Sequence, residues 1–225
     1  MRAEDTGMPL DLLAELRRIS TRLCLEEGGP HGPDHSERVL HNALAIGRVM
    51  GARLDILAPA ALLHDIGRRE ESRSRGAVCH AEAGADLAEA LLSGLGFSAA
   101  DRAAICGCIR SHRFRGRFRP ESLEACILFD ADKLDSIGAV GIGRAFLFAG
   151  QIGAKLHNAE LDHGTTAAYS LEDTACREFQ VKMSKVLSQM LTPPGREAAL
   201  RRHEFMETFF TELNLEIYGS ILPKT

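Results

Sequence analysis

Residues 60–67 read Ala-Ala-Leu-Leu-His-Asp-Ile-Gly, a hydrophobic helical segment that ends in two side chains able to bind a metal. Burying the imidazole of His64 and the carboxylate of Asp65 at such a place is costly unless something pairs with them. A divalent cation is the obvious candidate, because histidine nitrogen and aspartate oxygen suit borderline and hard first-row metals alike. The segment therefore predicts a metal site built around His64 and Asp65.

The hydrophobic pattern around this segment is helical almost throughout the chain. Apolar residues recur at spacings of three and four, and a clear two-residue alternation is hard to find. We expect an all-α bundle of roughly nine helices in one domain over residues 1–225, with a metal-binding core at about 20–148 and C-terminal helices at about 172–217. The aperiodic residues 150–170 are expected to form a long loop or a lid, and the polar residues 68–78 a loop. The expected helices cover residues 10–25, 34–50, 59–67, 80–95, 99–112, 123–137, 138–148, 172–191 and 196–217.

The composition is that of a soluble globular protein, and it narrows the set of partners. The chain has 225 residues, of which 45% are hydrophobic and 26% charged, and its net charge is −4. This acidic balance disfavours general nucleic-acid binding, which favours a basic surface. The sequence lacks a run of 18 apolar residues and a signal-peptide core, and its six cysteines lack the spacing of a disulfide framework. We therefore expect a cytoplasmic protein with reduced cysteines that binds neither nucleic acid nor membrane.

A histidine in the second expected helix is a further candidate ligand. His35 shares a helical stripe with Val39, Asn42, Ile46 and Val49, and this face is expected to point inward. A lone histidine on an apolar face is more often a satisfied core residue than a ligand, so the stripe by itself leaves both roles open.

Three carboxylates fall within a short stretch of an otherwise apolar helix: Asp130, Asp132 and Asp135. Asp130 lies on the apolar stripe of this helix, whereas Asp132 falls on the same side as Asp135. Spacing alone leaves open which of them binds metal.

The order His35, His64-Asp65, Asp132 resembles the H…HD…D pattern of the HD-domain superfamily of metal-dependent phosphohydrolases. In that family the last aspartate usually sits in an Ala-Asp-(Arg/Lys)-Leu context, which matches residues 131–134 and selects Asp132. The resemblance thus implies an HD-type helical fold in which His35, His64, Asp65 and Asp132 bind the metal. Several segments are similar to a bacterial subgroup that includes nucleoside triphosphate pyrophosphohydrolases: residues 31–39, 61–67, 130–139, 190–196 and 202–206.

His80 and His112 follow the HD pair in the order of an expanded ligand set that some HD proteins use. In that H…HD…H…H…D set, the added histidines hold a second metal and the HD aspartate bridges both ions. The alternative, which we favour because the subgroup is often described with one bound metal, makes them supporting donors or phosphate contacts around a single ion. The expected cofactor is one divalent cation (Mn, Mg, Co, Ni, Fe or Zn), with a second metal as the alternative. His80, His112 and Asp130 are the candidates for the catalytic base.

Basic residues next to these ligands are candidates for holding a phosphate, because phosphoryl chemistry needs positive groups that position the anion. Residues 113–119 contain four arginines directly after His112. The alternatives are a solvated surface for the arginines and core ion pairing for the residues near Asp132. The candidate substrate-binding residues are His31, Arg68, Arg113, Arg115, Lys133, Asp135 and Arg144.

One departure from related families bears on the substrate. HD nucleotidases that cleave monophosphates often carry an acidic residue three places after the HD aspartate, as do the HD hydrolases that act on guanosine tetraphosphate. Arg68 occupies that place here, which disfavours both substrate classes.

The predicted function is hydrolysis of a phosphate ester, with a nucleotide as the small-molecule substrate. Its most specific form is cleavage of a (deoxy)nucleoside triphosphate to the monophosphate and pyrophosphate. A di-iron oxygenase of the HD type is the first alternative, and a regulatory domain that binds metal or nucleotide without turnover is the second. The final amphipathic helix is a candidate surface for a homodimer.

Overall fold

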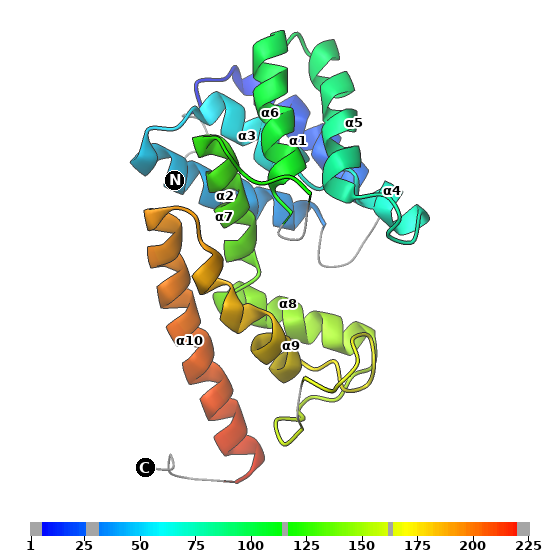
Figure 1. Ribbon diagram of the computed structural model, residues 1–225, viewed down its shortest axis with the longest axis vertical. Coiled ribbons are helices and arrows are strands. Elements are labelled where there is room, and N and C mark those ends of the chain that lie inside the picture. The colour runs from blue at the N-terminus through cyan, green and yellow to red at the C-terminus, as the bar shows by residue number, and fades with distance from the viewer. Residues whose placement is uncertain (1–5, 26–31, 114–116, 162–163, 220–225) are drawn as a thin grey trace. The chain divides into compact units, whose positions relative to one another are not determined.

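The computed structural model describes residues 6–25, 32–113, 117–161 and 164–219. Within these ranges all regular secondary structure is helical, comprising ten α-helices and two short 3-10 helices and no strand (Figure 1). This confirms the all-α prediction. The chain forms two compact units, residues 1–132 and 133–225. The single domain over residues 1–225 stays a prediction.

The first unit is built around α3 (Leu54–Leu63), which packs against three other helices: α1 (Leu10–Leu25), α2 (Pro33–Met50) and α6 (Ala99–Ser111). Every residue of α3 from Ile56 to Leu63 is buried. A helix that is apolar all round is stable only when it is covered on all sides. The apolar part of residues 60–67 therefore lies at the centre of this unit, and the polar residues that follow it lie in the interior.

Two further helices form an antiparallel pair in the first unit. α5 (His80–Gly94) packs against α6, and a short connection over residues 95–98 joins them (Figure 1). Because the pair is antiparallel, the first residue of α5 and the residue after α6 lie at the same end. The remaining elements of this unit are α4 (Arg68–Arg73), which packs against α5, and α7 (Leu123–Asp135), whose last three residues lie beyond the unit boundary.

The second unit contains α8 (Gly138–Gln151), α9 (Ala175–Val181), the 3-10 helices η2 (Met183–Lys185) and η3 (Leu187–Gln189), and α10 (Pro193–Ile217). α8 packs against α9 and α10. The described residues between α8 and α9 carry no helix, as expected for the aperiodic stretch. Asn158 anchors this segment. Its side chain is fully buried and donates to the backbone carbonyl of Glu172 at 2.9 Å. A role as a lid stays a prediction.

Several element boundaries differ from the prediction for local reasons. α2 begins at Pro33 with Gly32 as its N-cap, one residue before the expected start of this helix at residue 34. α3 begins at Leu54, so Pro59 lies inside the helix rather than in its first turn. There it cannot donate the usual hydrogen bond to the carbonyl of Asp55, and its ring crowds that carbonyl.

The polar stretch predicted as a loop contains α4, although none of the residues of this helix is buried. Periodicity cannot reveal such a helix, because it has no apolar face. The predicted helix over residues 172–191 is also wrong. The chain there forms α9, η2 and η3, and the backbone leaves the helical region at Lys182, between α9 and η2. The last helix starts at Pro193, earlier than expected, since Thr192 caps it and prolines suit a first turn.

No helix among the described residues is both long and apolar enough to cross a membrane.

Candidate metal centre

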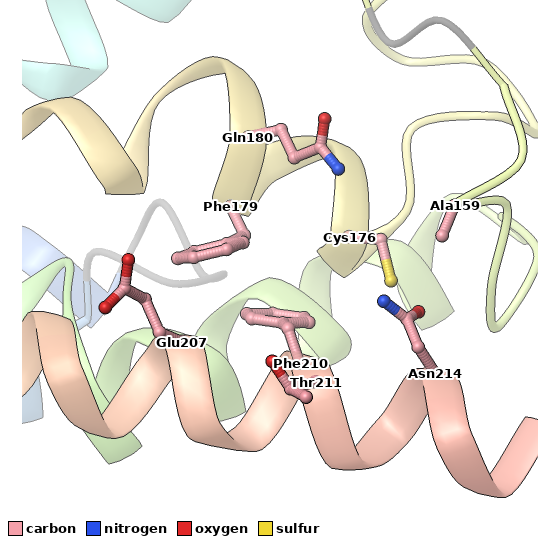
Figure 2. A pocket seen from close by; sticks show the side chains of 8 residues that line it. All are labelled: Ala159, Cys176, Phe179, Gln180, Glu207, Phe210, Thr211 and Asn214. Atoms are coloured by element: carbon pink, nitrogen blue, oxygen red, sulfur yellow. The ribbon is translucent and has the colours of Figure 1, made fainter. Parts of the chain in front are cut away.

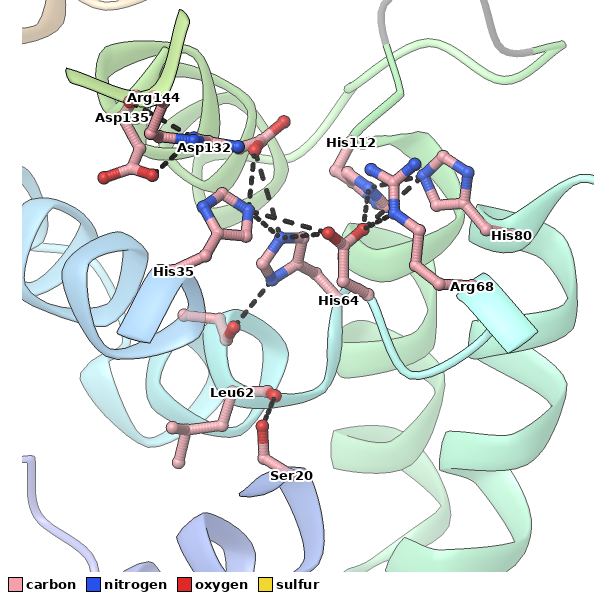
Figure 3. A network of polar contacts seen from close by, with 12 residues as sticks. Ser20, His35, Leu62, His64, Arg68, His80, His112, Asp132, Asp135 and Arg144 are labelled. Atoms are coloured by element: carbon pink, nitrogen blue, oxygen red, sulfur yellow. Dashed lines mark hydrogen bonds and ion pairs between the residues drawn. The ribbon is translucent and has the colours of Figure 1, made fainter. Parts of the chain in front are cut away.

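His64 and Asp65, the HD pair, lie in the tight turn that follows α3. His64 is the C-cap residue of that helix, and the turn continues to Gly67, where α4 begins. Both side chains are inaccessible, with exposed fractions of 0% for His64 and 2% for Asp65. The hydroxyl of Ser20 on α1 donates to the backbone carbonyl of Leu62 at 2.6 Å and fixes the end of α3 (Figure 3). The sequence prediction of a buried imidazole next to a buried carboxylate is therefore confirmed.

The carboxylate of Asp65 lies between two pairs of histidines. Its Oδ2 atom is 3.6 Å from the Nε2 atoms of both His35 and His64. Its Oδ1 atom is 3.6 Å from the Nε2 atoms of both His80 and His112. Figure 3 shows the four imidazoles gathered around this place, each from a different part of the first unit. Thus residues 35, 64, 65, 80 and 112 meet as the sequence order implied.

Asp132 on α7 joins the pair formed by His35 and His64. Its Oδ1 atom is 3.4 Å from Nε2 of His35 and 3.9 Å from Nε2 of His64. The side chain of Asn42 on α2 donates to the backbone carbonyl of Ala131 at 3.3 Å, which anchors α7 next to α2. We call His35, His64, Asp132 and Oδ2 of Asp65 the first half of the centre, and His80, His112 and Oδ1 of Asp65 the second half.

The structure separates the carboxylates that helical spacing left undecided. Two groups of side chains bring their ligand atoms within 4.8 Å of one another: His35, His64 and Asp132, and His64, Asp65 and His112. Asp130 is fully buried on the same helix as Asp132 but belongs to neither group. Its proposed role as a base stays a prediction.

Hydrogen bonds fix the tautomers of three of the histidines. Nδ1 of His64 lies 2.8 Å from the carbonyl of Ala61, and Nδ1 of His112 lies 2.6 Å from the carbonyl of Ile109. Nδ1 of His80 lies 2.9 Å from Oε2 of Glu71. Carbonyl and carboxylate oxygens only accept, so in each case Nδ1 carries the proton. In the neutral rings Nε2 therefore presents a lone pair to the centre.

Burial keeps the rings of His64 and His80 neutral. It lowers the pKa of His64 to about 4. Burial, reinforced by the positive charge of Arg68, lowers the pKa of His80 to about 2. A neutral imidazole with its lone pair directed inward is the form that binds a metal ion.

The contact between His80 and His112 calls for a cation or a hydrogen-bond donor at the centre. Their Nε2 atoms are 3.3 Å apart, and the tautomers described above make both atoms acceptors. Two lone pairs facing each other at this distance are unfavourable unless a cation, a proton or a water molecule lies against them. Together with the carboxylates, these nitrogen donors form the mixed His/Asp set that divalent first-row metals accept.

Positive groups surround the second half. Nε of Arg68 is 3.0 Å from Oδ1 of Asp65, and Nη1 of Arg113 is 3.0 Å from Oε1 of Glu71. Burial lowers the pKa of Arg68, but the ion pair with Asp65 outweighs that effect, and the pKa is raised overall. Sequence reasoning missed Glu71, because it lies in a polar stretch without periodicity and belongs to no recognised motif.

Other predicted site residues fall in the second unit or outside the described chain. Asp135 is buried and forms an ion pair of 2.6 Å with Arg144, which also donates to its backbone carbonyl. Lys133 begins the second unit. His31 and Arg115 lie outside the described residues. Substrate roles for these five residues stay predictions.

The second unit contains a pocket of different chemistry. This cavity of about 270 Å³ contains the stacked rings of Phe179 and Phe210, whose centroids are 4.5 Å apart (Figure 2). Its lining residues include one carboxylate, Glu207, but no histidine and no basic residue. Such a lining does not fit a metal ion or a phosphate, so the candidate site is the His/Asp centre in the first unit.

Comparison with known proteins agrees with this geometry. Residues 34–137 match the family model of the HD domain. A protein of Bacillus subtilis strain 168, the uncharacterized protein YpgQ, is 34% identical over 208 residues, which cover 91% of this chain and 93% of the relative. The chain belongs to the HD-domain superfamily.

Solved structures of HD proteins extend the likeness over nearly the whole chain. Bacillus subtilis YpgQ in complex with ADP has a TM-score of 0.72 and 29% identity, covering 92% of this chain and 99% of that protein. A predicted HD-superfamily hydrolase from an uncultured Thermotogales bacterium has a TM-score of 0.64 and 29% identity, with 92% of each chain covered. The HD likeness therefore includes the second unit as well as the residues that the family model matches.

Proposed function

We propose that this HD protein is a divalent-metal-dependent phosphohydrolase that acts on nucleotides. The observation that carries the proposal is the convergence of four histidine Nε2 atoms on the two oxygens of one buried carboxylate, Asp65. Neutral imidazoles and carboxylates in this arrangement are a ligand set for a metal ion, and no packing role requires them to meet.

The first half of the centre would hold the ion. It offers two imidazole nitrogens and two carboxylates, His35, His64, Asp65 and Asp132, from α2, the turn after α3, and α7. A divalent ion there supplies a Lewis acid that activates water and screens the charge developing on phosphorus. The chain's own contribution is to keep the ligands neutral or negative, dry and fixed in orientation.

The second half is less suited to a second ion. His80 and His112 offer lone pairs, but the guanidinium of Arg68 already lies 3.0 Å from the oxygen that a second ion would share. A second dication would be repelled by that charge, whereas a water molecule can donate a hydrogen bond to either imidazole. We therefore place one ion in the first half and assign His80 and His112 to orienting a water molecule, with His112 as the residue that accepts a proton from it.

Two observations support a nucleotide as the substrate: an arginine beside the centre and the ligand of a related protein. Arg113 has about a third of its side chain exposed (37%) and lies beside the centre, where it can reach a phosphate. Bacillus subtilis YpgQ has been crystallised with ADP, which supports a nucleotide as the ligand. The most specific form of the proposal is release of pyrophosphate from a ribo- or deoxynucleoside triphosphate.

The test is a product assay on metal-exchanged protein. The chain is stripped with a chelator, reloaded with Mn²⁺ and incubated with nucleoside triphosphates, and pyrophosphate and orthophosphate are measured separately. Asp65→Asn is compared with Asp86→Asn, a control whose carboxylate pairs with Arg110 at 2.9 Å on the exposed side of α5 and α6. We expect metal-dependent pyrophosphate release in the wild type and the control, and a loss of roughly 1,000-fold or more in Asp65→Asn.

The other outcomes favour the alternatives. Two irons per chain with oxygen consumption and no phosphate release would overturn the proposal in favour of a di-iron oxygenase. Stoichiometric metal without turnover of any nucleotide would overturn it in favour of a regulatory metal-binding domain.

A further inference from the structure

We propose that Glu71 is a positioning residue, which fixes the tautomer of His80 so that its Nε2 lone pair faces the centre. The inference deepens the proposed function and rests on it, since it assigns to the second half a residue that acts through His80. Glu71 itself lies behind the imidazole, with its Oε2 atom 2.9 Å from Nδ1 of His80.

The partner of His80 differs in kind from those of the neighbouring histidines. His64 and His112 each donate their Nδ1 proton to the backbone carbonyl of the residue three places earlier, Ala61 and Ile109. The backbone of α3 and α6 thus orients these two rings without help from any side chain. His80 is the first residue of α5, so no preceding turn of its own helix offers a carbonyl. A side chain from elsewhere has to accept its proton, and Glu71 on α4 does so.

The surroundings of Glu71 hold it in this place. Its side chain is 19% exposed and accepts from three groups, because Arg68 and Arg113 also contact it, at 3.3 Å and 3.0 Å. Arg113 also donates to the sulfur of Cys79, the residue before His80, at 3.4 Å. The carboxylate thereby connects α4, the start of α5 and the residue that follows His112 in one network.

Loss of this carboxylate has a specific consequence at the centre. A neutral His80 without an acceptor at Nδ1 is free to move its proton to Nε2. That nitrogen lies 3.3 Å from Nε2 of His112, so it would donate a hydrogen bond to His112 across the second half. Neither nitrogen would then offer a lone pair to a bound water or ion. Glu71 prevents this and leaves both lone pairs available. Partners that orient metal-site histidines typically contribute roughly 10- to 100-fold to metal affinity or activity.

The experiment is nitrogen NMR of the metal-free, histidine-labelled protein, which reports the tautomer of each ring without any turnover. The samples are the wild type, Glu71→Ala, Glu71→Gln and the control Glu89→Gln, whose carboxylate accepts from Arg102 at 2.7 Å on α5. We expect His80 to be protonated at Nδ1 in the wild type, the control and Glu71→Gln, whose amide oxygen can still accept. In Glu71→Ala the proton should shift to Nε2, and nucleotide hydrolysis should fall roughly 10- to 100-fold, with partial rescue in Glu71→Gln.

A wild-type spectrum with His80 protonated at Nε2 would overturn the inference, and so would an unchanged tautomer in Glu71→Ala. The wild-type spectrum carries the test by itself if Glu71→Ala does not fold. Failure of the proposed function has a different signature, because the tautomers would then be as expected while the loaded wild type hydrolyses no nucleotide.

Discussion

The two halves of the centre share one carboxylate and have two histidines each, yet their charges differ. The first half adds the carboxylate of Asp132, 3.4 Å from His35. The second half adds the guanidinium of Arg68, 3.0 Å from Asp65. The same donor atoms are therefore placed in a negative environment on one side and in a partly positive one on the other.

The types of donor atom alone therefore do not define a metal site. Four imidazoles around one aspartate are compatible with either one ion or two. The charge of the group added to each half, Asp132 or Arg68, decides between them. The first half suits a dication, and the second half suits water and the phosphate that the reaction consumes.

Removing one histidine from each half should have the largest and most unequal effects. His64→Ala should lose the bound metal and nearly all hydrolysis, because it deletes a ligand of the first half. His112→Ala should keep about one metal per chain while activity falls roughly 100- to 10,000-fold, as expected for loss of a group that assists proton transfer. Metal content by plasma mass spectrometry and pyrophosphate release check both variants. Equal metal loss in the two variants would remove the distinction between the halves.

A side chain added at Gly67 should disturb both halves of the centre. A Cβ atom there would lie 2.3 Å from the carbonyl oxygen of His80 and 2.4 Å from the backbone nitrogen of Gly84, so the turn carrying Asp65 cannot keep its approach to α5. Gly67→Ala should lower the free energy of unfolding by about 1–3 kcal/mol and reduce metal binding.

The control for this variant is Gly107→Ala on α6, where an added Cβ meets nothing within 4 Å. It should stabilise the protein by about 0.5–1 kcal/mol, because alanine is the better helix former. Urea unfolding measures both variants, and an unchanged stability in Gly67→Ala would contradict the close packing of the turn against α5.

Arg113 tests whether the positive side of the centre binds phosphate. Arg113→Ala should raise the KM for a nucleoside triphosphate about tenfold, since a charged hydrogen bond to phosphate is lost, and should leave the metal content unchanged. The matched control is Arg110→Ala, which removes a surface ion pair with Asp86 and a contact over the ring of Phe118 but no group of the centre. A tenfold fall in kcat at constant KM would argue against a substrate-binding role.

The smallest expected effect is on the stability of the metal-free protein against pH. The pKa of His64 is about 4 and that of His80 about 2 in the folded chain, both below the ordinary value of 6.5. The unfolded chain therefore binds more protons below about pH 6.5, and stability should fall as the pH is lowered from 6.5 towards 4. Thermal unfolding between pH 7 and 5 should show this trend, with a shallower slope in His80→Asn. Equal slopes for the two proteins would show that His80 takes up a proton in the folded state.

Much of the first half could be predicted from the sequence. An apolar helix that ends in His64 and Asp65 indicates burial of both, and the resemblance to HD proteins selected Asp132 where spacing had left Asp130 and Asp135 as equals. The stripe through His35 was less reliable. His35, Val39 and Ile46 are buried as expected, but Val49 has 75% of its surface exposed at the end of α2. A periodic pattern identifies the buried face of a helix without showing how far the neighbouring elements extend along it.

The second half was harder to predict, because it depends on charges brought together from separate helices. His80 and His112 lie near Asp65, at 3.6 Å, but their roles stay predictions and their partners were not foreseen. Glu71 lies on α4, which has no apolar face and was expected to be a loop. The contact of Arg68 with Asp65 is formed in the turn between α3 and α4, where the backbone N–H of Arg68 also donates to the carbonyl of Asp65 at 3.1 Å.

Anomalous X-ray diffraction at the manganese edge from Mn²⁺-loaded crystals would locate the ion. We expect one anomalous peak per chain, within coordination distance of His35, His64, Asp65 and Asp132. A peak held by His80 and His112 alone, or no peak in the centre, would contradict this expectation.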